Sequence, residues 1–133
     1  MLQKSETVTL MPIKKMDRAL AFYTDKLGAK VNMRGDGDMK DDWASIKVAG
    51  HEVWLITPSK REKREVAYTS FVVKDIKKIV TGLQKKGVKF DAAEDMGPGS
   101  KVEGPIAWSP IGGTAFFPDS EGNLLMLYQM GEM

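Results

Sequence analysis

Apolar residues recur along the chain in a pattern that occurs twice. In each copy, alternating apolar and polar residues lead into apolar residues at helical spacing, which indicates a strand followed by an amphipathic helix. The first copy comprises Val8, Met11, Ile13, Met16, Leu20 and Tyr23, and the second comprises Tyr68, Phe71, Val73, Ile76, Val80 and Leu83. Each helical pattern ends at a glycine, Gly28 or Gly87. A repeated unit of this size cannot bury its apolar face alone, so we expect the two copies to pack together around a cleft.

The elements predicted for the two halves are similar. The first half predicts a strand over Thr7–Ile13, a helix over about Met16–Leu27, and strands over Lys30–Met33, Trp43–Val48 and Glu52–Thr57. The second half predicts a strand over Ala67–Val73, a helix from Asp75 to about Lys86, and strands over Lys89–Ala92, Ile106–Trp108, Gly113–Phe117 and Leu124–Gln129. Residues 95–105 are rich in Gly and Pro and predict a long flexible loop, and Asp119–Asn123 predicts a tight turn.

The predicted fold class is therefore α+β, with two repeated β-α-β-β-β modules. We expect a curved mixed sheet around a cup, with the helices on its outer face. The modules span 7–57 and 66–130, a charged connector spans 58–65, and together they form a single domain over 1–133. Alternation along the strands assigns their faces. The side chains expected to face the cup are Val8, Leu10, Glu52, Trp54, Ile56, Tyr68, Ser70, Leu124, Met126 and Tyr128.

The composition narrows the range of partners and cofactors. The chain has 133 residues, no cysteine and a net charge of +2. The connector, in which Lys and Arg outnumber Glu, accounts for this net charge. Without cysteine there is no disulfide and no thiolate ligand, and this fits a cytoplasmic protein. Apolar runs are too short for a membrane span, and the N-terminal MLQKSET lacks the apolar stretch of a secretory signal, so we expect neither. The positive charge is one local run and not a stripe along a face, so we expect no nucleic-acid partner.

Three stretches of sequence resemble the vicinal oxygen chelate superfamily. They are MDRALAFYTDKLGAKV, FVVKDIKKIVTGLQKKGVKF and FFPDSEGNLLMLYQ. The superfamily includes glyoxalase I, extradiol dioxygenases, fosfomycin-resistance enzymes and bleomycin-binding proteins. The resemblance implies two paired β-α-β-β-β modules, in agreement with the pattern above. Relatives of this length are commonly homodimers, and we expect a homodimer here on that analogy.

The resemblance also indicates where a metal would bind. Metal-dependent relatives place His, Gln or Glu at one cup-facing position on each of four strands. The matching positions in this chain are Val8, Trp54, Tyr68 and Met126. None of these side chains is a good ligand for a hard or borderline divalent cation. We therefore expect no metal and no other cofactor.

Aromatic side chains form the alternative to a metal site. Flat aromatic walls beside a methionine suit stacking on a planar or apolar ligand. The predicted ligand-binding residues are Trp54, Tyr68, Met126, Trp108, Val8, Trp43, Tyr128 and Arg34. Arg34 or Glu52 would orient a polar group of the ligand. The competing interpretation is that these aromatic side chains close the cup and leave no pocket.

The preferred hypothesis is a protein that binds or sequesters an apolar or aromatic small molecule without a metal, as bleomycin-binding proteins do. No catalytic residue is assigned. The alternative is a lyase or isomerase of the glyoxalase or dioxygenase type, with an unrecognised metal set or with Glu52 as general base. His51 is the only histidine and lies at a predicted hairpin turn, where an exposed polar residue is ordinary. A third interpretation is an interaction module whose cup is filled by its own side chains.

Overall fold

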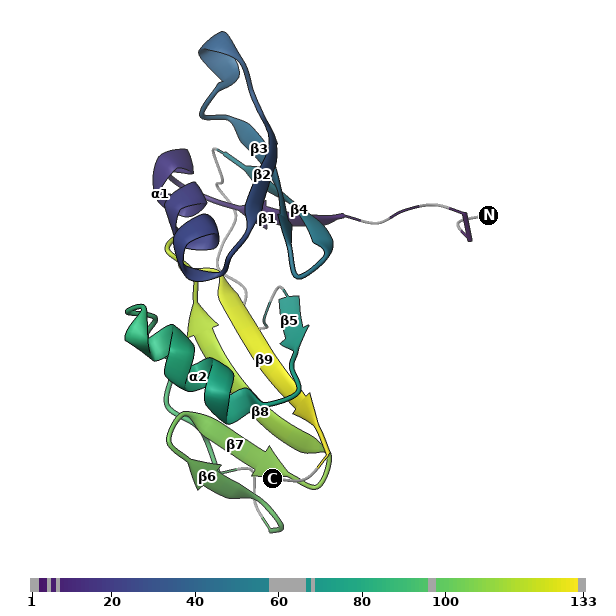
Figure 1. The fold of residues 1–133 in the computed structure, drawn as a ribbon, viewed down its shortest axis with the longest axis vertical. Coiled ribbons are helices and arrows are strands. Elements are labelled where there is room, and N and C mark those ends of the chain that lie inside the picture. Colours follow the sequence, from purple (N-terminus) through teal and green to yellow (C-terminus); the bar gives the residue numbers. More distant parts are fainter. Residues whose placement is uncertain are drawn as a thin grey trace. The chain divides into compact units, whose positions relative to one another are not determined.

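The chain folds into two compact units in a computed structural model that describes residues 3–4, 6, 8–57, 67, 69–95 and 98–131 (Figure 1). Unit 1 is Met1–Glu62 and unit 2 is Lys63–Met133. The predicted connector 58–65 and the predicted ligand contact Tyr68 lie outside the described residues. None of the described helices is long and apolar enough to cross a membrane.

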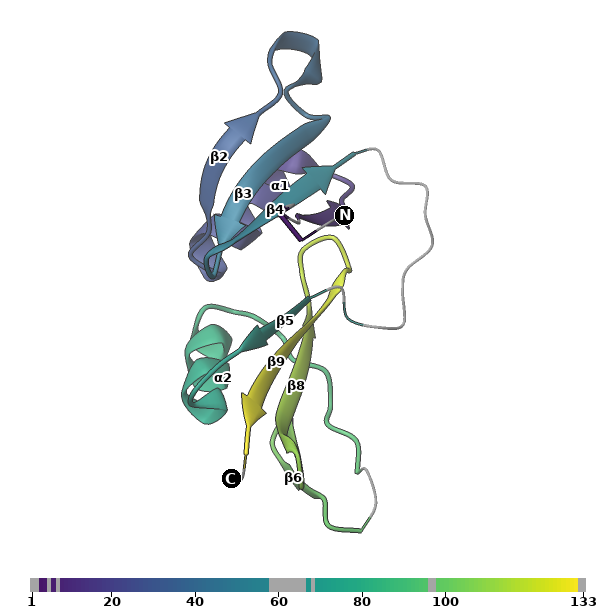
Figure 2. The same cartoon turned by 90° about the vertical axis from the view of Figure 1, so that its right-hand side faces the viewer.

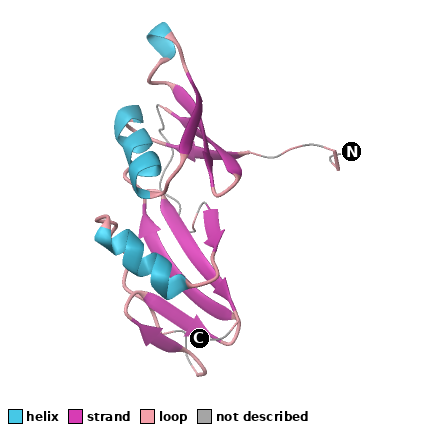
Figure 3. Ribbon diagram, viewed as in Figure 1, coloured by secondary structure: helices cyan, strands magenta, loops and turns pink. Residues whose placement is uncertain are grey.

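Unit 1 has one helical segment against one face of a four-stranded sheet (Figure 3). Its elements are β1 (Thr9–Pro12), α1 (Met16–Ala21), the π-helical turn η1 (Phe22–Lys26), β2 (Lys30–Arg34), the 3-10 turn η2 (Gly37–Met39), β3 (Trp43–Val48) and β4 (His51–Ile56). The strand order is β1-β4-β3-β2, with β1 parallel to β4 and the other pairs antiparallel. This is the predicted β-α-β-β-β order.

The core of unit 1 lies on the α1 side of its sheet. The strands bury alternate apolar residues there, and α1 and η1 bury the apolar face predicted from the sequence. These buried residues are Met11, Ile13, Met16, Ala19, Leu20, Phe22, Tyr23, Ala44, Ile46, Val48, Val53 and Leu55. The Thr24 hydroxyl donates to the carbonyl of Leu20 at 2.7 Å where the helix widens into η1. Gly28 follows with φ +73°, a conformation that favours glycine and ends the helix.

Unit 2 repeats this arrangement with one more strand (Figure 2). Its elements are β5 (Thr69–Val72), α2 (Ile76–Lys85), β6 (Lys101–Glu103), β7 (Ile106–Ser109), β8 (Gly112–Pro118) and β9 (Leu124–Met130). The strand order is β5-β9-β8-β7-β6, and β5 runs parallel to β9. Asp75 caps α2, as predicted, by accepting from the backbone N–H of Lys78 at 3.2 Å.

Two predictions for unit 2 are wrong. Residues 89–92 form no strand: the segment after α2 joins the edge of β8 through the Asp91 N–H, which donates to the Phe116 carbonyl at 2.8 Å. Instead, a strand forms at Lys101–Glu103, inside the predicted loop, because it pairs with β7. In α2, Ile76 and Val80 are buried as expected, whereas Ile79 is 37% exposed.

The fold class is therefore α+β, as predicted. Each unit places a single helix on one face of a mixed sheet, and the two sheets contain four and five strands. Among the described residues, the opposite face of each sheet has no helix. It carries Leu10, Glu52, Trp54 and Ile56 in unit 1 and Ser70, Leu124, Met126 and Tyr128 in unit 2, as predicted. That the two faces together enclose one cup stays a prediction.

Candidate ligand-binding faces

The helix-free face of unit 1 carries a stacked pair of tryptophans. Trp43 on β3 and Trp54 on β4 have ring centroids 5.8 Å apart and ring planes inclined by 20°. The register places Trp54 beside Leu10 and Ser45, on the face opposite the buried Leu55. Both indoles are partly exposed, so the pair presents a flat aromatic surface. The structure thus brings together two of the predicted ligand-binding residues.

Trp54 also has an unused hydrogen-bond donor. Its Nε1 is buried and has no partner within the described part of the chain. A buried donor without an acceptor typically carries a penalty of about 1–3 kcal/mol.

Exposed apolar side chains extend the tryptophan surface. Leu10 on β1 is 60% exposed, Met33 on β2 is 61% exposed, and Val8, just before β1, is 42% exposed. Leu10 is the register partner of Trp54, and Met33 is the register partner of Ser45, so Leu10 and Met33 lie on the same face as the tryptophans. Exposed apolar surface of this kind often marks an interaction site.

Glu52 lies on the same face, two residues before Trp54. It is half-buried, and its Oε1 accepts a hydrogen bond of 3.3 Å from the hydroxyl of the buried Ser45. Its register partner is the exposed Lys47. Glu52 therefore places a carboxylate beside the aromatic surface, as predicted from strand alternation.

Arg34, predicted as a polar contact for the ligand, lies on the other face. Its register partner is the buried Ala44, and its Nη2 contacts the Oδ1 atoms of Asp17 and Asp41 at 2.8 Å each. The hydrogen bond with Asp17, followed by that with Asp41, raises the pKa of Arg34, although burial acts in the opposite direction. The guanidinium thus joins α1 to the β2–β3 loop and does not point toward Trp54.

His51 begins β4 beside the Ala49–Gly50 turn. It is exposed, and its Nε2 lies 2.9 Å from the Thr9 hydroxyl. The prediction of an exposed residue at a hairpin is confirmed.

The helix-free face of unit 2 is lined by alternate residues of β8 and β9. Leu124, Met126 and Tyr128 are half-buried there, while the intervening Leu125 and Leu127 are buried on the α2 side. The faces predicted for this strand are confirmed. Met126 lies between Ser70 and Phe116 in the register, and the Tyr128 hydroxyl donates to the Ile111 carbonyl at 2.8 Å.

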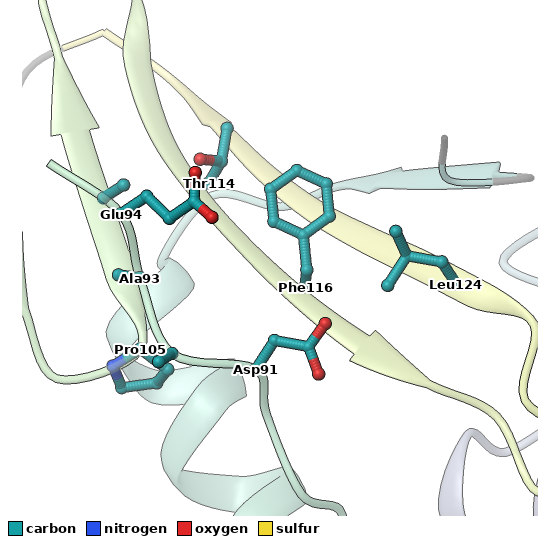
Figure 4. A pocket seen from close by; sticks show the side chains of 9 residues that line it. Asp91, Ala93, Glu94, Pro105, Thr114, Phe116 and Leu124 are labelled. Atoms are coloured by element: carbon teal, nitrogen blue, oxygen red, sulfur yellow. The ribbon is translucent and has the colours of Figure 1, made fainter. Parts of the chain in front are cut away.

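A cavity of about 400 Å³ opens on this face of unit 2 (Figure 4). Its volume lies within the range of about 300–1,000 Å³ that is typical of small-molecule pockets. The sheet contributes apolar side chains and one hydroxyl, and the segment after α2 contributes two carboxylates. The lining residues are Asp91, Ala92, Ala93, Glu94, Pro105, Ala107, Thr114, Phe116 and Leu124. Strand alternation in Gly113–Phe117 would have indicated Phe116, but no sequence signal indicated Asp91 or Glu94.

Trp108, predicted to contact the ligand, instead belongs to the core of unit 2. It is 4% exposed and is paired with Gly113, which shares the α2 side of the sheet with Ala115 and Phe117. A Cβ atom added to Gly113 would lie 2.8 Å from the Trp108 ring, so the indole occupies the space that the glycine leaves free. The pairing with Gly113 turns Trp108 to the α2 side, so it does not line the helix-free face of unit 2.

The family model that matches the chain is described as the Glyoxalase/Bleomycin resistance protein/Dioxygenase superfamily. The match covers residues 7–127, which includes both units. The chain belongs to this superfamily. No curated protein matches the chain.

Solved structures of the superfamily share the fold. An antibiotic-binding protein, TnmS3 from Streptomyces sp. CB03234, is 19% identical with a TM-score of 0.64, and the match covers 97% of this chain and 99% of that one. A glyoxalase/bleomycin resistance protein/dioxygenase from Alicyclobacillus acidocaldarius is 21% identical with a TM-score of 0.67, over 96% and 92% of the two chains. A point mutant of the fosfomycin resistance protein FosX from Listeria monocytogenes, in complex with Mn(II), is 14% identical with a TM-score of 0.71, and the match covers 100% of this chain and 95% of that one. At these identities the likeness establishes a shared fold.

The loss of the superfamily's metal site stays a prediction, which rests on the chemistry of the side chains at the expected ligand positions. Val8 has no donor atom, and the indole of Trp54 and the thioether of Met126 are poor ligands for a hard divalent cation. Among the described residues, no group of three His, Asp or Glu side chains is arranged to hold a metal ion. The chain has no cysteine to supply a thiolate.

Proposed function

We propose that this superfamily member binds or sequesters an apolar or aromatic small molecule without a metal ion. The observation that carries the proposal is the stacked Trp43–Trp54 pair on the helix-free face. The resemblance assigns Trp54 and Met126 to positions where metal-dependent relatives have a ligand. Met126 lies on the helix-free face of unit 2. Sharing a fold with an antibiotic-binding protein supports the same class of function.

Binding of this kind needs only a modest free energy from contacts between ligand and protein. A micromolar dissociation constant corresponds to about 8 kcal/mol. Each planar ring that stacks on an aromatic side chain contributes about 0.5–1.5 kcal/mol beyond the burial of its area. Sequestration needs no chemical step, so no catalytic residue is required.

Binding can be tested with a panel of planar aromatic compounds by tryptophan fluorescence. We expect quenching by at least one compound, loss of that response in Trp54→Ala, and a retained response in Trp108→Phe. Trp108 is the matched control because it is buried on the α2 side of its sheet. Quenching that is lost in Trp108→Phe but retained in Trp54→Ala would contradict the proposal. Silence across the panel would favour an interaction module with a filled cup.

Metal independence requires a separate measurement. Elemental analysis of the purified protein should find no stoichiometric zinc, nickel, manganese or iron, and chelation should leave ligand binding unchanged. A stoichiometric metal whose removal abolishes binding would contradict the proposal.

We further propose a cytoplasmic homodimer. Sedimentation equilibrium at several protein concentrations tests the dimer.

The position of Glu52 favours an enzyme as the second candidate. Its carboxylate lies on the aromatic face and accepts a hydrogen bond from Ser45, so it could remove a proton from a bound substrate. If Glu52 is a general base, Glu52→Gln should abolish turnover while leaving the binding of the same molecule intact. If the protein only binds, the wild type should return every bound compound chemically unchanged, as mass spectrometry can show.

A further inference from the structure

We infer that the cavity of unit 2 binds the cationic group of an aromatic organic ligand. The inference rests on the proposed function for the existence of an organic ligand, and it adds the ligand's charge and the residues that recognise it. The cavity has an apolar floor formed by Phe116, Leu124 and Ala107. The segment after α2 places Asp91 and Glu94 along one side of the cavity. None of the described residues that line it is Lys, Arg or His.

The backbone fixes this acidic segment against the sheet. The Asp91 N–H donates to the Phe116 carbonyl at 2.8 Å, beyond the point where β7 stops pairing with β8. The Phe90 ring packs on Phe117 with centroids 5.1 Å apart, on the α2 side of the sheet. These two contacts anchor the segment where it passes β8. Figure 4 shows the carboxylates of Asp91 and Glu94 directed toward the side of β8 that carries Phe116 and Thr114.

The small residues between the two acids leave room for a ligand. Ala92 and Ala93 line the cavity with a single methyl group each. A planar ring can therefore lie on Phe116 and Leu124 while an ammonium group reaches a carboxylate. A carboxylate or phosphonate ligand would meet two like charges and no compensating cation among the lining residues. The charge pattern thus favours cations and disfavours anions.

The exposure of the two carboxylates to solvent limits how strongly the cavity should prefer a cation over a neutral ligand. Asp91 and Glu94 are exposed, so each should contribute no more than a surface ion pair contributes. Together they should favour a cation over a neutral ligand of the same shape on the order of tenfold. Because exposed charges are screened by salt, the preference should shrink as the ionic strength rises from about 0.05 M to about 0.5 M.

Three naphthalene derivatives of similar shape provide the test. They are 2-naphthylmethylamine, which is cationic at neutral pH, the neutral 2-naphthylmethanol and the anionic 2-naphthoate. Binding is measured by isothermal titration calorimetry, and the site by amide chemical shifts in a ¹H–¹⁵N NMR spectrum. We expect the affinity order amine, alcohol, carboxylate, with the largest shifts at residues 91–94 and 114–116.

Four variants assign the preference to the cavity. Asp91→Asn and Glu94→Gln keep the side-chain shape, and each should reduce the advantage of the amine about two- to fivefold without weakening the alcohol. Asp38→Asn changes the net charge equally on the exposed η2 turn of unit 1 and should leave all three affinities unchanged. Ala93→Leu should weaken all three ligands by filling the cavity. Folding of each variant is checked from the same NMR spectra.

The outcomes separate this inference from the proposed function. Equal binding of the amine and the alcohol, or an amine preference that survives in the Asp91→Asn, Glu94→Gln double variant, would overturn the inference and leave the proposed function standing. Shifts confined to unit 1 would have the same meaning. No binding of any of the three compounds, together with silence of Trp54 across the aromatic panel, would overturn both.

Discussion

Asp119 holds the turn between β8 and β9, and its removal should destabilise unit 2 strongly. Its Oδ1 accepts from the backbone N–H groups of Glu121 and Asn123 at 2.8 Å each. Its Oδ2 accepts from the Asn123 side-chain amide at 2.9 Å. Asp119 is 5% exposed, and Glu121 and Asn123 are also buried, so water cannot readily replace these bonds. The turn also sets where β9 begins, and β9 carries Leu124 and Met126.

The magnitude follows from the donors left behind. Asp119→Ala leaves two backbone N–H groups and one amide without their acceptor. Each buried unsatisfied group costs about 1–3 kcal/mol. Since the turn can relax and admit water to part of the site, we expect a loss of about 2–4 kcal/mol in the free energy of unfolding. Asp119→Asn keeps one acceptor oxygen but sets an NH₂ group against the Asn123 amide, so it should lose about 1–2 kcal/mol.

Urea unfolding followed by circular dichroism measures these losses. The control is Asp38→Ala, because Asp38 is exposed and outside the turn, and it should change the free energy of unfolding by less than about 0.5 kcal/mol. Equal losses in Asp119→Ala and Asp38→Ala would refute the reasoning. A loss in Asp119→Asn as large as that in Asp119→Ala would show that the second carboxylate oxygen supplies most of the stabilisation.

Four further expectations use the same unfolding assay. Gly113→Ala should lose about 1–3 kcal/mol, because its Cβ would lie 2.8 Å from the buried ring of Trp108. Gly82→Ala, in the interior of α2 with no atom within 4 Å of the new Cβ, should gain about 0.5–1 kcal/mol, and a loss there would contradict the open space. Asp75→Ala removes the N-cap of α2 and should lose about 1 kcal/mol, whereas Asp75→Ser should recover most of it. Arg34→Gln should lose less than about 1 kcal/mol, since its partners are exposed, and a loss that does not shrink in high salt would argue against the ion pairs.

The sequence was sufficient to predict the modules because local and long-range signals agree there. The helix over 76–85 has an N-cap at Asp75, an apolar face and a glycine after its end, and each of these favours the same element. The alternating residues of β9 predict the buried and open faces correctly because no bulge interrupts Leu124–Met130. The same alternation assigns Trp54 to the open face, and the β3–β4 register adds Trp43 beside it.

The remaining features depend on pairings that local sequence does not encode. Lys89–Ala92 has a strand-like pattern, but it makes one backbone bond to β8 and no ladder. Lys101–Glu103 looks like loop and becomes a strand because β7 offers an open edge. The direction of the Trp108 side chain depends on its pairing with Gly113, which no pattern within Ile106–Trp108 reveals. The carboxylates of the unit 2 cavity were missed for the same reason.

The parallel pairs bear on how each unit folds during translation. In both units the first strand pairs with the last: Thr9 lies beside Val53, and Thr69 lies beside Leu125. Such a contact closes only after nearly the whole unit has left the ribosome, and contacts of long sequence separation slow folding. Unit 1 can close once β4 has emerged, while unit 2 is still being made. Unit 2 must wait for β9, which lies between β5 and β8, so a nascent chain stalled before Leu124 would lack the strand that joins β5 to the rest of its sheet.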